Sequence, residues 1–386
     1  MIPYGRQDIS QADIDAVIEV LHSNFLTQGP TVPRFENAVA EYCDAQFAVA
    51  VNSATSALHI ACLALDLGPE DWLWTSPNTF VATANCALYC GANVDFVDID
   101  PLTYNMSTVR LEEKLQAADK EGRLPKVVIP VHFAGQPSEM AKIHALSEKY
   151  GFYVIEDASH AIGASYDNIK IGACRHSCIT VFSSHPVKII TTGEGGMAVT
   201  NDEALAERLS RLRTHGITAD KAIMRPRSKT EIWNYQQIEL GFNYRMTDME
   251  AALGLSQLKR VDEFVSYRNQ IAARYDLELR PLPVTTPHQT DRTYSSYHLY
   301  PIRIDELQSK KTQRQLYDGL RKQGVAANLH YIPVHRQPYY EKLGFKSGDF
   351  PEAEKFHRDV ISLPIYPKLT KDQHSQVLAS LRDLLS

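Results

Sequence analysis

The sequence lacks the marks of several protein classes. Its 386 residues include only six cysteines, and none forms a C-x-x-C pair, which argues against a zinc ribbon or a thioredoxin-like motif. Lys and Arg number 40 against 46 Asp and Glu, so the net charge of −6 offers no basic excess for bulk binding of nucleic acid. With 19 glycines and 20 prolines, the chain is not collagen-like or of low complexity. We expect the cysteines to be free, buried thiols.

Long apolar runs are also missing. No run approaches the ~18 residues that a membrane span needs. The segment from Met1 to Arg6 has no apolar stretch of the kind found in signal peptides. We therefore expect a soluble, cytoplasmic protein. What is present is an ordinary globular composition, with 44% hydrophobic and 22% charged residues. At about 150 residues per domain, the length fits two domains.

Apolar strands alternate with helical segments along the first two-thirds of the chain. Strands are predicted at 47–51, 72–75, 94–97, 127–131, 153–156, 179–182 and 197–200, and helices at 11–21, 32–42, 53–65, 80–90, 137–150, 202–213 and 246–265. This alternation predicts βαβ units, an α/β fold and a mostly parallel sheet that is covered on both faces. Strands at 297–304 and 325–329 around a helix at 311–323 indicate a smaller α/β domain. We place a large domain at 1–250 and a C-terminal small domain at 251–386.

Two segments follow predicted strands with polar residues. Asn52 to Leu58 joins a strand to a helix through small and hydroxyl residues, so the first backbone N–H groups of the helix and its dipole offer an anion site. The alternative is an ordinary serine N-cap. Asp157 ends an apolar strand, where ligands of doubly wound sheets collect, and His160 follows three residues later. The alternative is an aspartate that caps the next turn. A metal role for His160 is not expected, since no His or Cys has the right spacing.

Lys188 lies between apolar residues, ahead of a turn rich in small residues that runs from Thr191 to Gly196. A desolvated lysine has a lowered pKa and can act as an amine nucleophile. The alternative is a surface lysine whose stem covers an apolar patch. The segment is neither a Walker A loop nor a G-x-G-x-x-G fingerprint. An anion cradle, then a carboxylate, then a lysine is what pyridoxal phosphate requires for its phosphate, its pyridine nitrogen and its Schiff base.

With these motifs the sequence resembles a known family, the DegT-type nucleotide-sugar aminotransferases. The resemblance covers nearly the whole chain from Tyr4, and it rests on LTQGP at Leu26, NSATSAL at Asn52, EDASHAIGA at Glu156, SSHPVKIITTGEGG at Ser183 and GFNYRMTDMEAALGLSQL at Gly241. It implies the fold type I of pyridoxal-phosphate transferases, with a mostly parallel seven-stranded sheet in the large domain. HPVKIITTGEGG and HYIPVHRQPYY look most like the transaminases of pseudaminic acid biosynthesis, whose substrate is a UDP-linked 4-keto-6-deoxy amino sugar.

The resemblance also implies a role for individual residues. Lys188 matches the Schiff-base lysine, Asp157 the partner of the pyridine nitrogen, and His160 a residue packed near the ring. The further cofactor contacts that it implies are Ala54, Thr55, Phe80, Ser183 and, from the partner subunit, Asn243. The nucleotide-sugar contacts that it implies are Tyr4, Asn24, Phe25, Leu26, Thr27, His330, Tyr331, Ile332 and Pro333. A homodimer and glutamate as the amino donor follow from the same resemblance.

Several alternatives stay open. Relatives commonly read F-S-F-H before the lysine, and here Ser184 takes the place of the second Phe, which leaves its packing open. A lysine at 188 favours amino transfer, because the family's dehydratase branch carries histidine there. The protein could instead use another UDP- or dTDP-linked keto-sugar, or act as a cofactor-binding regulator without turnover.

Two charged segments have competing interpretations. Asp98-Ile99-Asp100 has the D-x-D pattern of a glycosyltransferase metal site, but an acidic turn before Pro101 is the simpler interpretation, and we expect no metal. The basic stretch from Lys221 to Lys229 either meets the UDP diphosphate or is a solvated surface.

Overall fold

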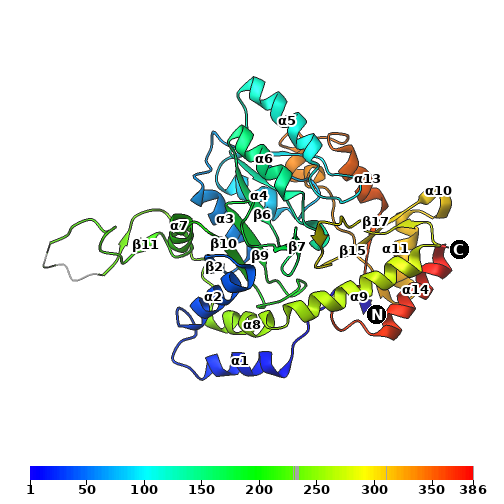
Figure 1. Cartoon of the computed structure of the whole chain (residues 1–386), viewed down its shortest axis with the longest axis horizontal. Coiled ribbons are helices and arrows are strands. Elements are labelled where there is room, and N and C mark those ends of the chain that lie inside the picture. Colours follow the sequence, from blue (N-terminus) through cyan, green and yellow to red (C-terminus); the bar gives the residue numbers. More distant parts are fainter. Residues whose placement is uncertain (229, 231–233, 310, 386) are drawn as a thin grey trace.

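A seven-stranded sheet lies at the centre of the computed structural model, which describes residues 1–228, 230, 234–309 and 311–385 (Figure 1). In sheet order the strands are β2 (Phe47–Val51), β10 (Gly196–Thr200), β9 (Ile179–Ser183), β6 (Tyr153–Asp157), β5 (Val127–Ile129), β3 (Trp72–Thr75) and β4 (Asn93–Phe96). Only β10 runs antiparallel to its neighbours, β2 and β9. The other pairs are parallel, so the prediction of a mostly parallel sheet of seven strands is confirmed.

Helices cover both faces of this sheet because successive side chains of each strand point to opposite sides. Val49 and Val51 of β2 pack into a first apolar cluster, whereas Ala50 between them packs into a second one. The helices that supply residues to the first cluster are α3 (Ala54–Ala64), α4 (Ala82–Tyr89), α7 (Glu203–Arg213), α12 (Pro338–Glu341) and α13 (Pro351–Asp359). Those of the second are α2 (Thr31–Cys43), α5 (Thr108–Glu121), α6 (Met140–Tyr150), α8 (Asp248–Leu258) and the first part of α9 (Val261–Leu279).

A third apolar cluster is built from the C-terminal third of the chain together with Ile2. Its elements are β1 (Ile2–Pro3), β15 (Tyr300–Ile304), β16 (Val325–Ala326), β17 (Val360–Leu363), α11 (Gln313–Lys322), α14 (Lys371–Leu385) and the second part of α9. Helix α9 joins the two regions, because Phe264 packs in the second cluster and Tyr275 in the third. The division into domains at about residue 250 stays a prediction.

The single helix predicted over 246–265 is wrong. The chain forms α8 (Asp248–Leu258), leaves helical geometry at Arg260 and begins α9 at Val261. Helix α8 packs against α1 (Gln11–Leu21) along the lower edge of Figure 1, while α9 crosses towards the C-terminal region. The apolar pattern runs through the break, since Leu258 and Val261 are both buried. Periodicity therefore gave no sign of the change in direction.

The remaining elements are short. They are β7 (Ser165–Tyr166), β8 (Ile169–Lys170), β11 (Ile217–Thr218), β12 (Gln236–Gln237), β13 (Val284–Thr285), β14 (Thr293–Tyr294), α10 (Glu306–Ser309), α12 (Pro338–Glu341), α13 (Pro351–Asp359) and two 3-10 turns at Phe133–Gly135 and Val334–Arg336. The described residues between β11 and β12 extend away from the rest of the molecule in Figure 1. All six cysteines are free thiols. Among the described residues, no helix is long and apolar enough to cross a membrane.

Candidate active site

A cavity of about 420 Å³ opens where the parallel strands end. Asp157 at the end of β6, Thr55 in the first turn of α3, and Phe80 and Lys188 in the loops after β3 and β9 lie on its wall. Carboxyl ends of parallel strands lie along one edge of a sheet, so residues far apart in sequence meet there. Ten residues predicted for the site line this cavity: Tyr4, Ala54, Thr55, Phe80, Asp157, His160, Ser183, Lys188, His330 and Tyr331.

Lys188 lies in the loop between β9 and β10, where its backbone N–H donates to the His185 carbonyl oxygen at 2.8 Å. Burial lowers the pKa of its ammonium group from 10.5 to about 8, and the Asp157 carboxylate opposes this shift. Burial removes water from the charged ammonium, so the neutral amine becomes more stable relative to the charged form. An amine that is free near neutral pH is what a nucleophilic lysine needs.

The lowered pKa predicts how Lys188 of the cofactor-free protein reacts with an amine-directed reagent. Only the neutral amine reacts, so the labelling rate of Lys188 should reach half its maximum near pH 8. Peptide mass spectrometry after brief labelling across a pH series measures this midpoint. In an Asp157→Asn variant the midpoint should fall further, because the opposing carboxylate charge is gone. A midpoint close to that of an ordinary lysine, about 10.4, would contradict the prediction.

Asp157 ends β6 with its carboxylate held by three donors. Thr83 Oγ1 donates to Oδ2 at 2.7 Å, and Ser159 donates to Oδ1 from its hydroxyl at 2.6 Å and from its backbone N–H at 3.1 Å. Thr83 comes from α4, so the carboxylate ties β6 to that helix. These neutral donors orient the carboxylate without pairing its negative charge, which suits a positive group in the cavity.

The start of α3 forms the predicted anion cradle. Ser53 is its N-cap and accepts from the Ser56 backbone N–H, and the Ala57 N–H makes the first intrahelical bond, to the Ser53 carbonyl. The N–H groups of Ala54 and Thr55 precede that bond and are therefore free for an anion. A Cβ on Gly196 would lie 2.5 Å from the Ala54 nitrogen, so only glycine lets β10 begin this close to the cradle.

His160 lies between Ala134 and Tyr331. The Ala134 backbone N–H donates to Nδ1 at 3.2 Å, so the ring proton is on Nε2. Nε2 is 3.1 Å from the Tyr331 hydroxyl oxygen, which therefore accepts. Burial, followed by the charges of Lys188 and His330, lowers the pKa of His160 well below 6.5 and keeps it neutral. The Tyr331 hydroxyl proton is then available to a group in the cavity.

His298 is a cavity residue that the sequence did not predict. This buried residue lines the cavity, and its ring centroid lies 4.3 Å from that of His160. Arg268 of α9 fixes the backbone here by donating to the carbonyl oxygens of Tyr297 and His298 at 3.1 and 3.3 Å. Burial lowers the pKa of His298, and the neighbouring His160 adds to the effect. No motif in the sequence marked this position, because it reaches the cavity from the C-terminal third of the chain.

The opening of the cavity is aromatic. Phe80 is 59% exposed and its ring lies 6.4 Å from that of Tyr331, so it has a free face at the edge of the cavity. Tyr4 arrives through the pairing of β1 with β16, and its ring lies 5.3 Å from that of His330. Burial and the Lys188 charge lower the pKa of His330 to about 3. Exposed aromatic faces are suited to stacking against a ring.

Other predicted residues do not line this cavity. The segment from Asn24 to Thr27 lies beside α8, where the Leu26 carbonyl accepts from the Asp248 N–H at 2.9 Å and Phe25 lines a separate cavity of about 380 Å³. Ile332 and Pro333 follow Tyr331 but stay outside the wall, and Asn243 is exposed. Their roles at the site remain predictions.

Structural roles account for two segments with alternatives. Asp98 accepts from the backbone N–H groups of Glu352 and Ala353 at 2.9 and 3.0 Å, and so caps α13. Asp100 accepts from the backbone of Leu102 and Thr103 in the next turn. Within the described residues, no group of three or more His, Cys, Asp or Glu side chains could hold a metal ion.

Ser184 stands in place of the usual Phe. Its hydroxyl forms a hydrogen bond of 2.6 Å with the Thr192 hydroxyl and so joins both ends of the loop that contains Lys188.

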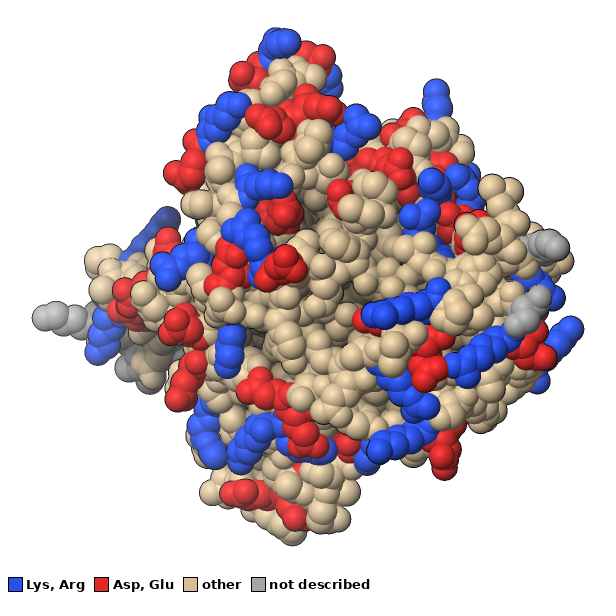
Figure 2. Space-filling view, turned by 45° about the vertical axis from the view of Figure 1, so that its right-hand side comes forward, with Lys and Arg blue, Asp and Glu red and all other residues tan. Residues whose placement is uncertain are grey.

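The basic stretch from 221 to 229 belongs to the extended connection between β11 and β12, and Lys229 lies outside the described residues. None of its described residues lines the 420 Å³ cavity of this chain. Figure 2 shows basic and acidic side chains interspersed over one face of the molecule, in keeping with the absence of a basic excess.

The cavity fits pyridoxal phosphate on three counts. Lys188 offers a desolvated amine, Asp157 a carboxylate that faces the cavity and suits the ring nitrogen, and the start of α3 backbone N–H groups for the phosphate. Phe80 and His160 provide rings on the wall between these groups. All the polar features that the cofactor needs therefore meet in one cavity.

Comparisons with known proteins identify the family. The DegT/DnrJ/EryC1/StrS aminotransferase family matches residues 7–382. Spore coat polysaccharide biosynthesis protein SpsC of Bacillus subtilis is 38% identical over 100% of this chain and 97% of its own length. The UDP-4-amino-4,6-dideoxy-N-acetyl-β-L-altrosamine transaminase of Campylobacter jejuni is 38% identical over 96% of this chain and 93% of its own.

Solved structures of aminotransferases are also similar to this chain. PseC of Helicobacter pylori, an aminotransferase involved in the biosynthesis of pseudaminic acid, superposes with a TM-score of 0.89 at 31% identity and covers 100% of this chain and 99% of its own. The PLP form of the sugar aminotransferase Spr1654 of Streptococcus pneumoniae has a TM-score of 0.88 at 27% identity, with 100% of both chains covered. The chain therefore belongs to the DegT/DnrJ/EryC1/StrS aminotransferase family, has the type I fold and is a transaminase with pyridoxal phosphate as its cofactor.

Proposed function

We propose that the protein transfers an amino group from glutamate to C4 of a UDP-linked 4-keto-6-deoxy-N-acetylamino sugar, as a UDP-4-amino-4,6-dideoxy-N-acetyl-β-L-altrosamine transaminase of pseudaminic acid biosynthesis. The observation that carries the proposal is the 38% identity to the Campylobacter jejuni transaminase of that name over 96% of this chain. The similarity to Helicobacter pylori PseC, at a TM-score of 0.89, supports it.

The residues of the cavity fit such a reaction. Pyridoxal phosphate supplies an electron sink that carries the amino group between the two substrates. Lys188 Nζ takes the proton from the α carbon of glutamate and later delivers one to C4 of the sugar, for which a pKa of about 8 is well matched. Asp157 holds positive charge at the ring nitrogen. The net reaction exchanges the C4 oxygen of the sugar for the amino group and α hydrogen of glutamate, giving 2-oxoglutarate.

We propose that the active protein is a homodimer. The segment from Asn24 to Thr27 and the side chain of Asn243 lie outside the cavity of their own chain. The exposed side chains of Phe25, Leu26, Ile14 and Ile18 form an apolar surface around α1. A partner that covers this surface could bring residues of one chain to the cavity of the other.

An assay of the holoenzyme with glutamate and a panel of keto-sugars tests the substrate. The panel pairs UDP-linked 4-keto-6-deoxy-N-acetylamino sugars that differ in one stereocentre with a dTDP-linked 4-keto-6-deoxy sugar. We expect the highest kcat/KM for a UDP-linked acetamido sugar, with the amine detected by mass spectrometry. Alanine and aspartate in place of glutamate test the donor. A preference for the dTDP-linked sugar would contradict the proposal.

One observation favours a second candidate. Spore coat protein SpsC is as similar to this chain as the Campylobacter transaminase, at 38% identity and over the whole length. An aminotransferase for another nucleotide-linked keto-sugar is therefore the alternative, and the same panel separates the two.

A further inference from the structure

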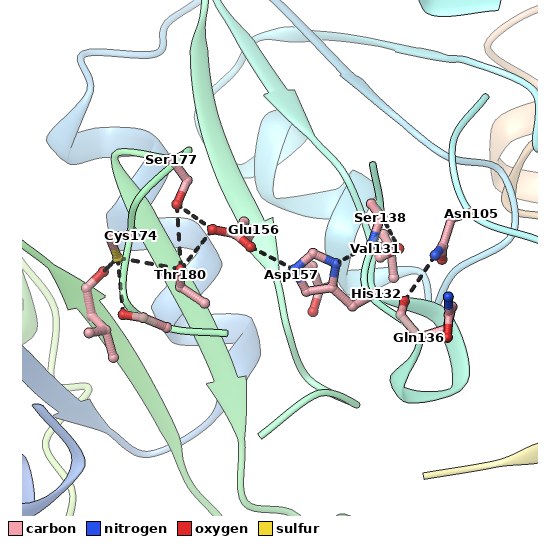
Figure 3. A network of polar contacts seen from close by, with 12 residues as sticks. Asn105, Val131, His132, Gln136, Ser138, Glu156, Asp157, Cys174, Ser177 and Thr180 are labelled. Carbon is pink, nitrogen blue, oxygen red and sulfur yellow. Dashed lines mark hydrogen bonds and ion pairs between the residues drawn. The ribbon is translucent and has the colours of Figure 1, made fainter. Parts of the chain in front are cut away.

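A buried polar network lies directly behind the candidate active site (Figure 3). At its centre Glu156 accepts a hydrogen bond from His132 Nε2 at 2.7 Å. Its other carboxylate oxygen accepts from the hydroxyl groups of Ser177 and Thr180 at 2.5 and 3.2 Å. The proposed reaction uses none of these four residues, and none of them lines the cavity.

Glu156 and Asp157 are neighbours on β6, so their side chains point to opposite faces of the sheet. Asp157 lies on the face of Ile155, which packs in the first apolar cluster with α3 and α4. Glu156 lies on the face of Val154, which packs in the second cluster with α2, α5 and α6. The Glu156 carboxylate therefore cannot touch the cofactor, although it belongs to the adjacent residue.

The hydrogen bonds favour the ionised form of Glu156. His132 Nδ1 accepts from the Ser138 backbone N–H at 3.0 Å, so the ring is neutral and donates through Nε2. A carboxylate accepts from this ring and from the Ser177 and Thr180 hydroxyl groups at the same time. Together these bonds outweigh the effect of burial and lower the pKa of Glu156 below 4.5.

This charge has no directly paired Lys or Arg in the part of the chain that the structure describes. The titratable groups that interact with Glu156 are His132, Cys174 and His176, and Lys170 and Arg175 line the same small cavity. Burial raises the pKa of Cys174 to about 12 and lowers that of His176, so both are neutral near pH 7. A buried charge without a paired cation destabilises the fold, so its presence here indicates a function.

The backbone links the network to Asp157. The Asp157 N–H donates to the Pro130 carbonyl at 3.0 Å, and the His132 N–H donates to the Asp157 carbonyl at 3.1 Å. His132 thus holds both the Glu156 carboxylate, through its ring, and the Asp157 backbone. On the cavity side the Asp157 charge acts on Lys188 and Tyr331, raising the pKa of both.

We propose that Glu156 is a positioning residue for the cofactor's protonation: its charge, held on the far face of β6, adds to that of Asp157 and keeps the ring nitrogen protonated. Adjacent Cα atoms are about 3.8 Å apart and the two side chains diverge, so the carboxylates lie on the order of 8–10 Å apart. The ring nitrogen would lie about 3 Å beyond the Asp157 carboxylate, so the Glu156 charge would act on it over roughly 11–13 Å. At an effective dielectric constant of about 20, one charge at that range shifts a pKa by about one unit. The inference concerns the cofactor and not the sugar.

A Glu156→Gln variant tests the charge alone. The amide oxygen can accept from His132 while the amide NH2 donates to Ser177 and Thr180, whose hydroxyl groups can turn to accept, so the bonding pattern is kept. Without substrate, the pH midpoint of the absorption change of the bound cofactor should fall by roughly one unit, since any proton on the cofactor becomes more acidic. We also expect kcat to fall by roughly tenfold for that shift, with the KM for glutamate nearly unchanged.

Ser177→Ala is the matched control, because it removes one hydrogen bond and keeps the charge. It should lower Tm and leave the absorption midpoint at the wild-type value. An unchanged midpoint in Glu156→Gln, or an equal shift in Ser177→Ala, would overturn the proposal.

If Glu156→Gln yields no folded holoenzyme, a double variant removes the charge by another route. Glu156→Met with His132→Leu replaces the pair by apolar side chains, an exchange that buried pairs often tolerate. It should show the same fall in the midpoint, and an unchanged midpoint would again overturn the proposal. Because the titration needs no sugar, its result is independent of whether the proposed substrate is correct.

Discussion

Replacing Lys188 by alanine is expected to abolish turnover, with a loss in kcat of at least about 10⁴-fold. The same amine attaches the cofactor and moves the proton, so its removal takes away both functions. Among the described residues, Lys188 is the lysine that lines this cavity, and the pKa of its buried amine is about 8. Nothing else on the wall offers a primary amine as a substitute.

Attachment and turnover can be measured separately. Borohydride reduction followed by intact-mass measurement should add the mass of the cofactor to the wild-type chain and not to Lys188→Ala. Lys188→Arg is the matched control, because it keeps a positive charge and a long stem but offers no nucleophilic amine. We expect it to be as inactive as the alanine variant. Full activity in either variant would refute the assignment of Lys188.

The central sheet was predictable because its strands are buried on both faces. Segments such as 47–51 and 72–75 are continuous apolar runs between polar turns, and the structure places β2 and β3 there. Helix α5 was missed although Leu111, Leu115 and Ala118 have helical spacing, because its other residues are strongly polar. The break between α8 and α9 was not predictable from the pattern, since it depends on which core each helix joins.

The residues of the site also divide into those that the sequence predicts and those that it does not. Lys188, Asp157 and the start of α3 were predictable because each lies in a short local motif after a strand. The backbone at His298 is held by Arg268, which lies 30 residues earlier in the chain, and no local sequence pattern indicates this contact. The pairing of His132 with Glu156 arises only when β5 and β6 lie side by side. Cavity residues in local motifs could therefore be predicted from the sequence, whereas contacts made by tertiary packing could not.

Asp157→Asn should produce the second large loss, a fall in kcat of roughly 10²–10³-fold, which is the range for removing one preorganised electrostatic group from an active site. Asparagine keeps the size of the side chain, and the Thr83 and Ser159 hydroxyl groups that now donate to it can reorient around the amide. The variant should therefore fold. It loses the charge that stabilises a proton on the ring nitrogen.

Thr83→Val is the matched control for Asp157→Asn, because it removes a 2.7 Å hydrogen bond to the carboxylate while the charge remains. We expect a loss of about tenfold or less, a barrier change of about 1.4 kcal/mol, since the charge remains and both Ser159 donors stay in place. Rates of the half-reaction with glutamate, followed by the absorption of the cofactor, compare both variants without the sugar. If the asparagine variant stays within tenfold of wild type, charge at position 157 is not what drives proton removal. The effect of Glu156→Gln should then also vanish, because both carboxylates are inferred to act on the same ring nitrogen.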